Sequence, residues 1–160
     1  MEWPYTSPMR MVMKQGYVRT TLAALLALAA VPAIAAPAVI EVYKTAACGC
    51  CALWVKHLRQ HGLSPRVTDV EDIGAVKIRH AVPRSVATCH TAIVEGYVIE
   101  GHVPATDILR LLQEKPAVRG LAVAGMPAGS PGMEGATSEA YDVVAFDKAG
   151  KMRVFSHHRR

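Results

Sequence analysis

The sequence lacks an apolar run long enough to span a membrane. The apolar run at residues 22–31 covers ten residues, whereas a membrane-spanning helix needs about 20. Concentrated positive charge is also missing, because the lysines and arginines are scattered and only Arg159 and Arg160 form a tight group. Internal repeats and low-complexity tracts are absent as well. We therefore expect no stable membrane anchor and no nucleic-acid partner.

The first 35 residues have the features of a signal peptide. Three basic residues, Arg10, Lys14 and Arg19, precede the apolar run, and small residues in an A-x-A arrangement follow it at positions 33–35. Cleavage after Ala35 or Ala36 would deliver the protein to the periplasm, and an uncleaved anchor is the weaker alternative. Cleavage after Ala35 leaves 125 of the 160 residues. That length is enough for one domain with its own core, which we expect to be a monomer.

Cysteine is scarce, and its distribution is uneven. Three of the four cysteines, Cys48, Cys50 and Cys51, lie within four residues, and Cys89 follows 38 residues after Cys51. Outside the cytoplasm, paired cysteines usually form structural disulfides. A bond inside this cluster would close almost no loop and would add little stability. The cluster is therefore expected to have a chemical role.

Patterns of hydrophobic residues predict alternating strands and helices. The predicted strands are residues 39–44, 66–70, 91–94 and 97–100, and the predicted helices are 51–62, 73–80 and a segment around 108–112. The order β-α-β followed by β-β-α is that of a thioredoxin-like domain, in which a cysteine motif caps the first helix. We predict an α/β fold with a mixed sheet flanked by helices, and we assign residues 36–116 to a thioredoxin-like metal-binding domain.

The remaining residues, 117–160, are predicted to form a C-terminal extension packed on the same domain. Residues 120–135 contain five glycines and two prolines, which predicts an irregular loop. Residues 141–146 and 152–156 are then expected to form a β-hairpin that turns at residues 147–150.

The cysteine motif favours metal chemistry. Cys48 and Cys51 have C-x-x-C spacing at the start of a predicted helix, where the helix dipole and free N–H groups stabilise thiolate, so they are expected to form a disulfide when metal is absent. Cys50 would interfere with simple dithiol exchange by offering competing mixed disulfides. Three clustered thiolates suit a soft ion such as Cu(I), whereas a structural zinc site usually uses two separated ligand pairs. Because adjacent cysteines diverge on a helix, bridging of more than one copper ion is expected.

Other residues are candidate ligands with less support. Cys89 precedes the third predicted strand, where a thioredoxin-like fold brings the chain to the cysteine motif, and His90 shares that position. Met126 and Met133 lie in the glycine-rich loop, and thioethers suit Cu(I). His157, next to His158, either folds back as a ligand or frays. His102 is expected to complete a turn, and His57 and His61 to lie on a solvated helix face.

Several motifs together resemble the CopG-like family of bacterial copper-resistance proteins. They are Cys48-Gly49-Cys50-Cys51 with Trp54, residues 85–92 around Cys89 and His90, residues 96–97 and 100–105, and the G-M-P and S-P-G-M segments at 125–134. The resemblance implies a periplasmic thioredoxin-like domain whose C-terminal extension adjoins a thiolate-bridged copper cluster. It also implies copper oxidation and reduction linked to efflux, with efflux components or a periplasmic electron donor as partners.

Three functions stay open at this point. The protein is a redox protein that interconverts Cu(I) and Cu(II), a module that only buffers or transfers Cu(I), or a thiol-disulfide oxidoreductase of the thioredoxin type. The sequence does not separate them.

Overall fold

The computed structural model describes Met1 and residues 38–159. The predicted signal peptide and its cleavage site therefore lie outside the described residues. Strands and helices follow in the order β1 (Val39–Lys44), α1 (Gly49–Gln60), β2 (Ser64–Asp69), α2 (Ile73–Arg79), the 3₁₀ turn η1 (Arg84–Val86), β3 (His90–Val94), β4 (Tyr97–Glu100), α3 (Ala105–Glu114), β5 (Gly120–Ala122), β6 (Tyr141–Phe146) and β7 (Met152–His158).

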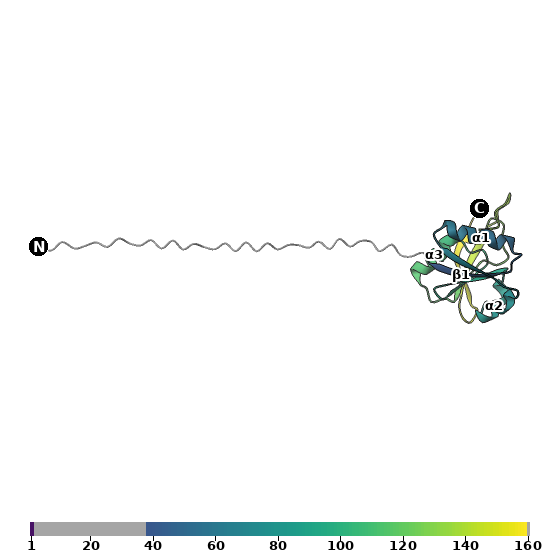
Figure 1. Ribbon diagram of the computed structural model, residues 1–160, viewed down its shortest axis with the longest axis horizontal. Coiled ribbons are helices and arrows are strands. Elements are labelled where there is room, and N and C mark those ends of the chain that lie inside the picture. The colour runs from purple at the N-terminus through teal and green to yellow at the C-terminus, as the bar shows by residue number, and fades with distance from the viewer. Residues whose placement is uncertain (2–37, 160) are drawn as a thin grey trace. The chain divides into compact units, whose positions relative to one another are not determined.

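The strands form one mixed sheet, so the predicted α/β architecture is confirmed. Within the described residues the sheet has seven strands in the order β2-β1-β3-β4-β5-β6-β7. β1 pairs with β2 and β4 pairs with β5 in parallel, and the other neighbours are antiparallel. Figure 1 shows α1 and α2 on opposite sides of β1.

The two faces of the sheet are covered differently because successive strand side chains point to opposite sides. The main core lies under α1 and α3, where Trp54, Leu58, Ile108 and Leu111 are fully buried. On the other face, a smaller cluster contains Val86, Val98, Ala122 and Phe146. α2 also lies on this second face, since its Lys77 reaches Thr91 and Glu100 there.

Strand β5 differs from the sequence-based expectation of an irregular loop beginning at residue 120. Gly120 approaches β4 so closely that a Cβ at this position would clash with the Val98 carbonyl oxygen. Pairing with β4 therefore requires glycine at position 120. Because glycine is a poor strand former, the local sequence does not indicate a strand here. The prediction was wrong for Gly120–Ala122, whereas residues 123–135 are irregular as expected, and the irregular segment continues to residue 140.

The predicted C-terminal hairpin is confirmed as β6 and β7. β7 extends two residues beyond the predicted end and is attached to α3. His158 Nε2 lies 2.7 Å from the buried carboxylate of Asp107, and Arg110 contacts both Asp107 and the Phe155 carbonyl oxygen. None of the helices in residues 38–159 is both long and apolar enough to cross a membrane.

Candidate metal centre

The cysteine motif begins α1. Cys48 is the N-cap residue, with an extended backbone, and no side chain caps the helix there. Cys51 is fully buried and starts the apolar stripe that continues with Trp54, Val55 and Leu58. A disulfide joins Cys48 to Cys51 with their Cα atoms 5.4 Å apart, while Cys50 and Cys89 are free thiols. The C-x-x-C spacing predicts this pairing.

Cys89 completes a group of four sulfur atoms. It directly precedes β3, which runs antiparallel to β1, so the chain reaches the end of β1 where the cysteine motif begins. Its sulfur lies 3.4 Å from that of Cys51, and the sulfurs of Cys48 and Cys50 lie 3.7 Å apart. All four sulfurs lie within 4.8 Å of one another.

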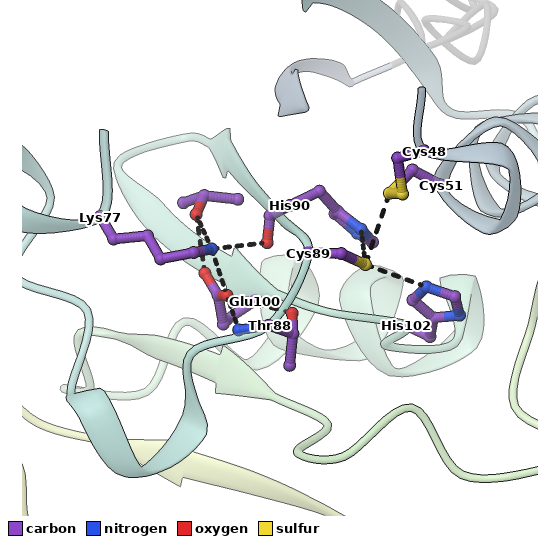
Figure 2. Close-up of polar contacts among 9 residues, drawn as sticks. Cys48, Cys51, Lys77, Thr88, Cys89, His90, Glu100 and His102 are labelled. Atoms are coloured by element: carbon purple, nitrogen blue, oxygen red, sulfur yellow. Dashed lines mark hydrogen bonds and ion pairs between the residues drawn. A yellow bond between two sulfur atoms is a disulfide. The ribbon is translucent and has the colours of Figure 1, made fainter. Parts of the chain in front are cut away.

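Two buried histidines lie on the other side of Cys89. The Cys89 sulfur is 3.6 Å from His90 Nδ1 and 3.7 Å from His102 Nε2, and these three ligand atoms also lie within 4.8 Å of one another. Figure 2 shows Cys89 between the Cys48–Cys51 disulfide and His102. The His90 ring packs on Trp54 with ring centroids 4.3 Å apart, which fixes its orientation.

The remaining ring nitrogens of the two histidines are unsatisfied. Both residues are fully buried, and neither His90 Nε2 nor His102 Nδ1 has a hydrogen-bond partner among the described residues. Buried polar atoms are usually paired because an unpaired one costs about 1–3 kcal/mol. These two nitrogens are not the ones nearest the Cys89 sulfur. The candidate ligand atoms are the other nitrogens of the two rings, His90 Nδ1 and His102 Nε2, which lie beside that sulfur.

Burial sets the protonation of this group. Burial, and then the neighbouring His102 and the Lys77 ammonium, lower the pKa of His90 to about 3. Burial also lowers the pKa of His102. Both imidazoles are therefore neutral at neutral pH, which is the form that binds metal. Burial, followed by the neighbouring Cys50, raises the pKa of Cys89 to about 11, so metal binding at Cys89 releases a proton.

The donor set fits a soft metal ion. Thiolate sulfur is the preferred ligand of Cu(I), and imidazole nitrogen also binds copper. The disulfide limits this capacity, because the sulfurs of Cys48 and Cys51 are not thiolates while they are bonded to each other. The Cys48–Cys51 disulfide must be reduced by two electrons before all four cysteines can act as thiolate ligands.

The three other predicted ligands lie in the C-terminal part of the chain. Met126 is 38% exposed and has a positive φ. Met133 is partly buried, and the preceding Gly132 packs on the first turns of α1, where an added Cβ would lie 2.7 Å from the Cys50 carbonyl oxygen. His157 Nδ1 lies 2.6 Å from Asp142 on the hairpin, and His157 is not among the described residues whose ligand atoms gather at the cysteines.

The helix-face histidines have a structural role. The backbone N–H of Ala105 donates to His57 Nε2 at 3.0 Å. His57 therefore pairs one of the N–H groups that have no partner within the first turn of α3. His61 Nδ1 lies 2.8 Å from the carbonyl oxygen of His57. His57 therefore joins α1 to α3, whereas His61 stays exposed at the end of α1.

The position of His102 beside Cys89 is not expected from the sequence, which indicates a turn residue there. The hairpin contains a usable signal, because Val94 pairs with Tyr97 and Thr91 with Glu100. Continuing that register past the hairpin places residues 89 and 90 beside residues 101 and 102. Cys89 and His102 lie at equal distances along the chain from the Glu95–Gly96 turn, so the hairpin register predicts that they are neighbours.

Comparison with known proteins identifies the family. A family model described as a protein of unknown function, DUF411, matches residues 86–133, which include Cys89, His90 and His102. No curated protein sequence matches the chain.

Two solved structures are similar to it. One is described as copper resistance protein CopG, form 2, with 45% identity and a TM-score of 0.73, and the match covers 76% of this chain and 98% of the other. The other is form 1 of a protein of the same description, with 44% identity, a TM-score of 0.73 and coverage of 78% and 99%. The chain belongs to the CopG family of copper resistance proteins.

Proposed function

We propose that this protein binds copper through the thiolates of Cys48, Cys50, Cys51 and Cys89 once the Cys48–Cys51 disulfide is reduced. The observation that carries the proposal is the convergence of four cysteine sulfurs within 4.8 Å. The relatives described as copper resistance proteins support copper as the metal. His90 and His102 add two neutral imidazoles beside Cys89. The bound form is Cu(I), with more than one ion per chain, because thiolate sulfur bridges Cu(I) ions.

Interconversion of Cu(I) and Cu(II) is the second part of the proposal. The disulfide and its two thiols form a two-electron couple at the site. Two Cu(II) ions accept one electron each as Cys48 and Cys51 form their disulfide and release two protons. A reductant from the periplasm then restores the thiols. The same disulfide at the start of α1 also favours the alternative of thiol-disulfide exchange with a protein partner.

We also propose a cellular setting. The first four strands, with α1 and α3 on one face and α2 on the other, fit a thioredoxin-like unit, and the exported protein works in the periplasm. There it supplies copper in one oxidation state to efflux components. The signal-peptide features of residues 1–35 and the relatives' description as copper resistance proteins support this setting.

Anaerobic Cu(I) titration against a competing chelator tests the proposal. The reduced protein is expected to bind more than one Cu(I) per chain, and the disulfide form to bind less. Cys89→Ser should lower the copper count or affinity, whereas His157→Ala, which removes an exposed side chain paired with Asp142, serves as the matched control. A reduced wild-type protein that binds no copper would exclude the function.

A second measurement separates redox handling from binding. Cu(II) is added to the reduced, metal-free protein, and thiols, Cu(I) and disulfide positions are measured. The proposal expects two Cu(I) for each disulfide formed, and that disulfide to join Cys48 and Cys51. A protein that only stores copper would bind added Cu(I) without this linked stoichiometry. Reduction of a disulfide substrate without copper would favour the thiol-disulfide oxidoreductase.

A further inference from the structure

A buried ion pair lies beside the candidate metal centre. The Glu100 carboxylate at the end of β4 is fully buried, and the Lys77 ammonium from α2 donates to its Oε1 at 2.6 Å. The same oxygen accepts from the backbone N–H of Thr88 at 2.6 Å and from the Thr88 hydroxyl at 3.0 Å. The Thr91 hydroxyl donates to Oε2 at 2.7 Å.

These contacts flank Cys89 and His90, which supply a thiol and an imidazole. Thr88 precedes Cys89, and Thr91 follows His90, so one carboxylate holds the backbone on both sides of the Cys89–His90 pair. Lys77 adds a bond to the His90 carbonyl oxygen at 3.3 Å and one to the Thr91 hydroxyl at 3.0 Å. Figure 2 shows this network adjoining Cys89 on the side away from the disulfide.

The network also reaches His102. Glu100 is two residues before His102, and its own carbonyl oxygen accepts from the Val123 N–H at 3.0 Å. Gly101 has a φ of +72°, and a Cβ there would lie 2.6 Å from the Val123 carbonyl oxygen and 2.9 Å from the Thr88 hydroxyl oxygen. The segment that carries His102 is therefore packed against the residue that precedes Cys89.

Stability alone is a weak reason for this pair. Moving two charges out of water costs free energy that their attraction often fails to recover, and replacing a buried pair by neutral groups is often harmless to stability. Removing one partner only is harmful, because the other charge remains buried without compensation. The Glu100 carboxylate accepts hydrogen bonds from four donors, of which Lys77 is one, beside a cluster of sulfur and imidazole groups. This arrangement points to a role in geometry.

We propose that Lys77 and Glu100 are positioning residues that hold Cys89, His90 and His102 in the arrangement that binds copper. The inference rests on the proposed function. Residues that orient metal ligands through hydrogen bonds typically change metal affinity by about 10- to 100-fold when they are substituted.

The test compares a double variant with a matched control. Lys77→Met with Glu100→Gln removes both charges at similar side-chain size, so no uncompensated charge stays buried. Lys115→Met with Glu95→Gln removes an exposed pair, 3.8 Å apart, at the far ends of α3 and the β3–β4 hairpin. The apparent Cu(I) dissociation constant of each reduced protein is measured by chelator competition, with thermal unfolding of the metal-free form and the alkylation rate of Cys89 alongside.

The first double variant is expected to unfold near the wild-type temperature, bind Cu(I) about 10- to 100-fold more weakly and show faster Cys89 alkylation. The control should match wild type in all three. Unchanged copper affinity and unchanged alkylation in the first variant would overturn the inference while leaving the proposed function intact. Failure of wild type to bind copper would instead remove the proposed function.

A third substitution covers the case in which the double variant does not fold. Thr91→Val removes the hydroxyl that donates to Glu100 and accepts from the Lys77 ammonium, at nearly constant volume, and Thr91→Ser retains a hydroxyl. The valine variant is expected to bind Cu(I) more weakly and the serine variant to recover most of the affinity. Equal affinities for both and for wild type would contradict a positioning role.

Discussion

At the scale of single residues, the two adjacent cysteines of the motif face different neighbours. Cys51 is fully buried and lies 3.4 Å from Cys89, measured between sulfurs, whereas Cys50 is partly exposed and lies 3.7 Å from Cys48. The helical backbone turns successive side chains by about 100°, yet the sulfurs of Cys50 and Cys51 stay within 4.8 Å of each other. Cys50 is a free thiol in this group of four sulfurs, and under the proposed function it is the thiolate expected to bridge copper ions.

Replacement of Cys50 tests this bridging role. Because a bridging thiolate supports several ions at once, Cys50→Ser is expected to lower the copper count by more than one per chain while the fold stays intact. The copper-to-protein ratio is measured after anaerobic Cu(I) loading with a competing chelator, and circular dichroism checks the fold. A wild-type ratio of about one would argue against a cluster and for a simple chaperone site.

His90 predicts a pH dependence of stability in the metal-free protein. Its pKa falls from 6.5 to about 3 on folding, mainly through burial. Between these values the unfolded chain binds one proton more than the folded chain, so the contribution is complete above pH 6.5 and is lost as the pH falls toward 3. Lowering the pH from 7 to 5 should cost about 2 kcal/mol of unfolding free energy through this residue.

Denaturant unfolding of His90→Gln at both pH values measures that contribution, because glutamine does not titrate. The variant is expected to lose less stability than wild type between pH 7 and pH 5, by about 2 kcal/mol. His61→Gln, at the exposed C-cap of α1, is the comparison variant in which the replaced histidine is exposed. An identical pH dependence in His90→Gln would show that burial does not keep this histidine neutral.

At the scale of elements, the glycine-rich loop is seated on α1 through Gly132. This residue has a φ of +89°, and an added Cβ would lie 2.7 Å from the Cys50 carbonyl oxygen and 2.8 Å from the Trp54 nitrogen. Both atoms belong to the helix backbone, which cannot move aside easily to make room for a Cβ. The contact therefore brings the loop that carries Met133 against the helix that carries the cysteines.

Gly132→Ala is expected to push the loop off α1. Backbone strain and the clash together should lower the unfolding free energy by about 2 kcal/mol, and Cu(I) affinity should fall if the loop contributes ligands. Gly135→Ala provides a close control, because a Cβ there meets nothing within 4 Å and its φ is not positive. Denaturant unfolding and chelator competition compare the two, and equal effects would contradict this account of the contact.

At the scale of the whole molecule, one core and one sheet join the two parts that the sequence analysis separates at residue 116. β4 pairs with β5, and the main core contains Ile99 and Ile108 from the first part together with Leu121 and Val143 from the second. The C-terminal residues therefore continue the sheet. This continuity places the glycine-rich loop and the cysteine motif in one folded unit.

The signal-peptide features predict that the exported chain is cleaved. The basic, apolar and A-x-A segments in order lead us to expect that the mature protein begins after Ala35 or Ala36. The intact mass of protein recovered from the periplasm of a bacterial host measures this directly. A membrane-bound product that retains residues 22–31 would contradict both the cleavage and the location.

The sequence alone determined the local elements and the centre of the site. Strand β1, the buried stripe of α1 and the β3–β4 hairpin follow from periods of two and 3.6 residues and from turn residues, which act over a few positions. Cys48, Cys50 and Cys51 were evident because their spacing lies within one helical turn.

Only the tertiary structure decided which distant residues join them. The Lys77–Glu100 pair and strand β5 depend on how α2 and the C-terminal strands meet the rest of the sheet. His157 shows the reverse case, since a metal-binding residue type lies beside Asp142 instead of the cysteines. Residue type states what a side chain can bind, but its neighbours are set by strand register and packing between segments far apart in the chain.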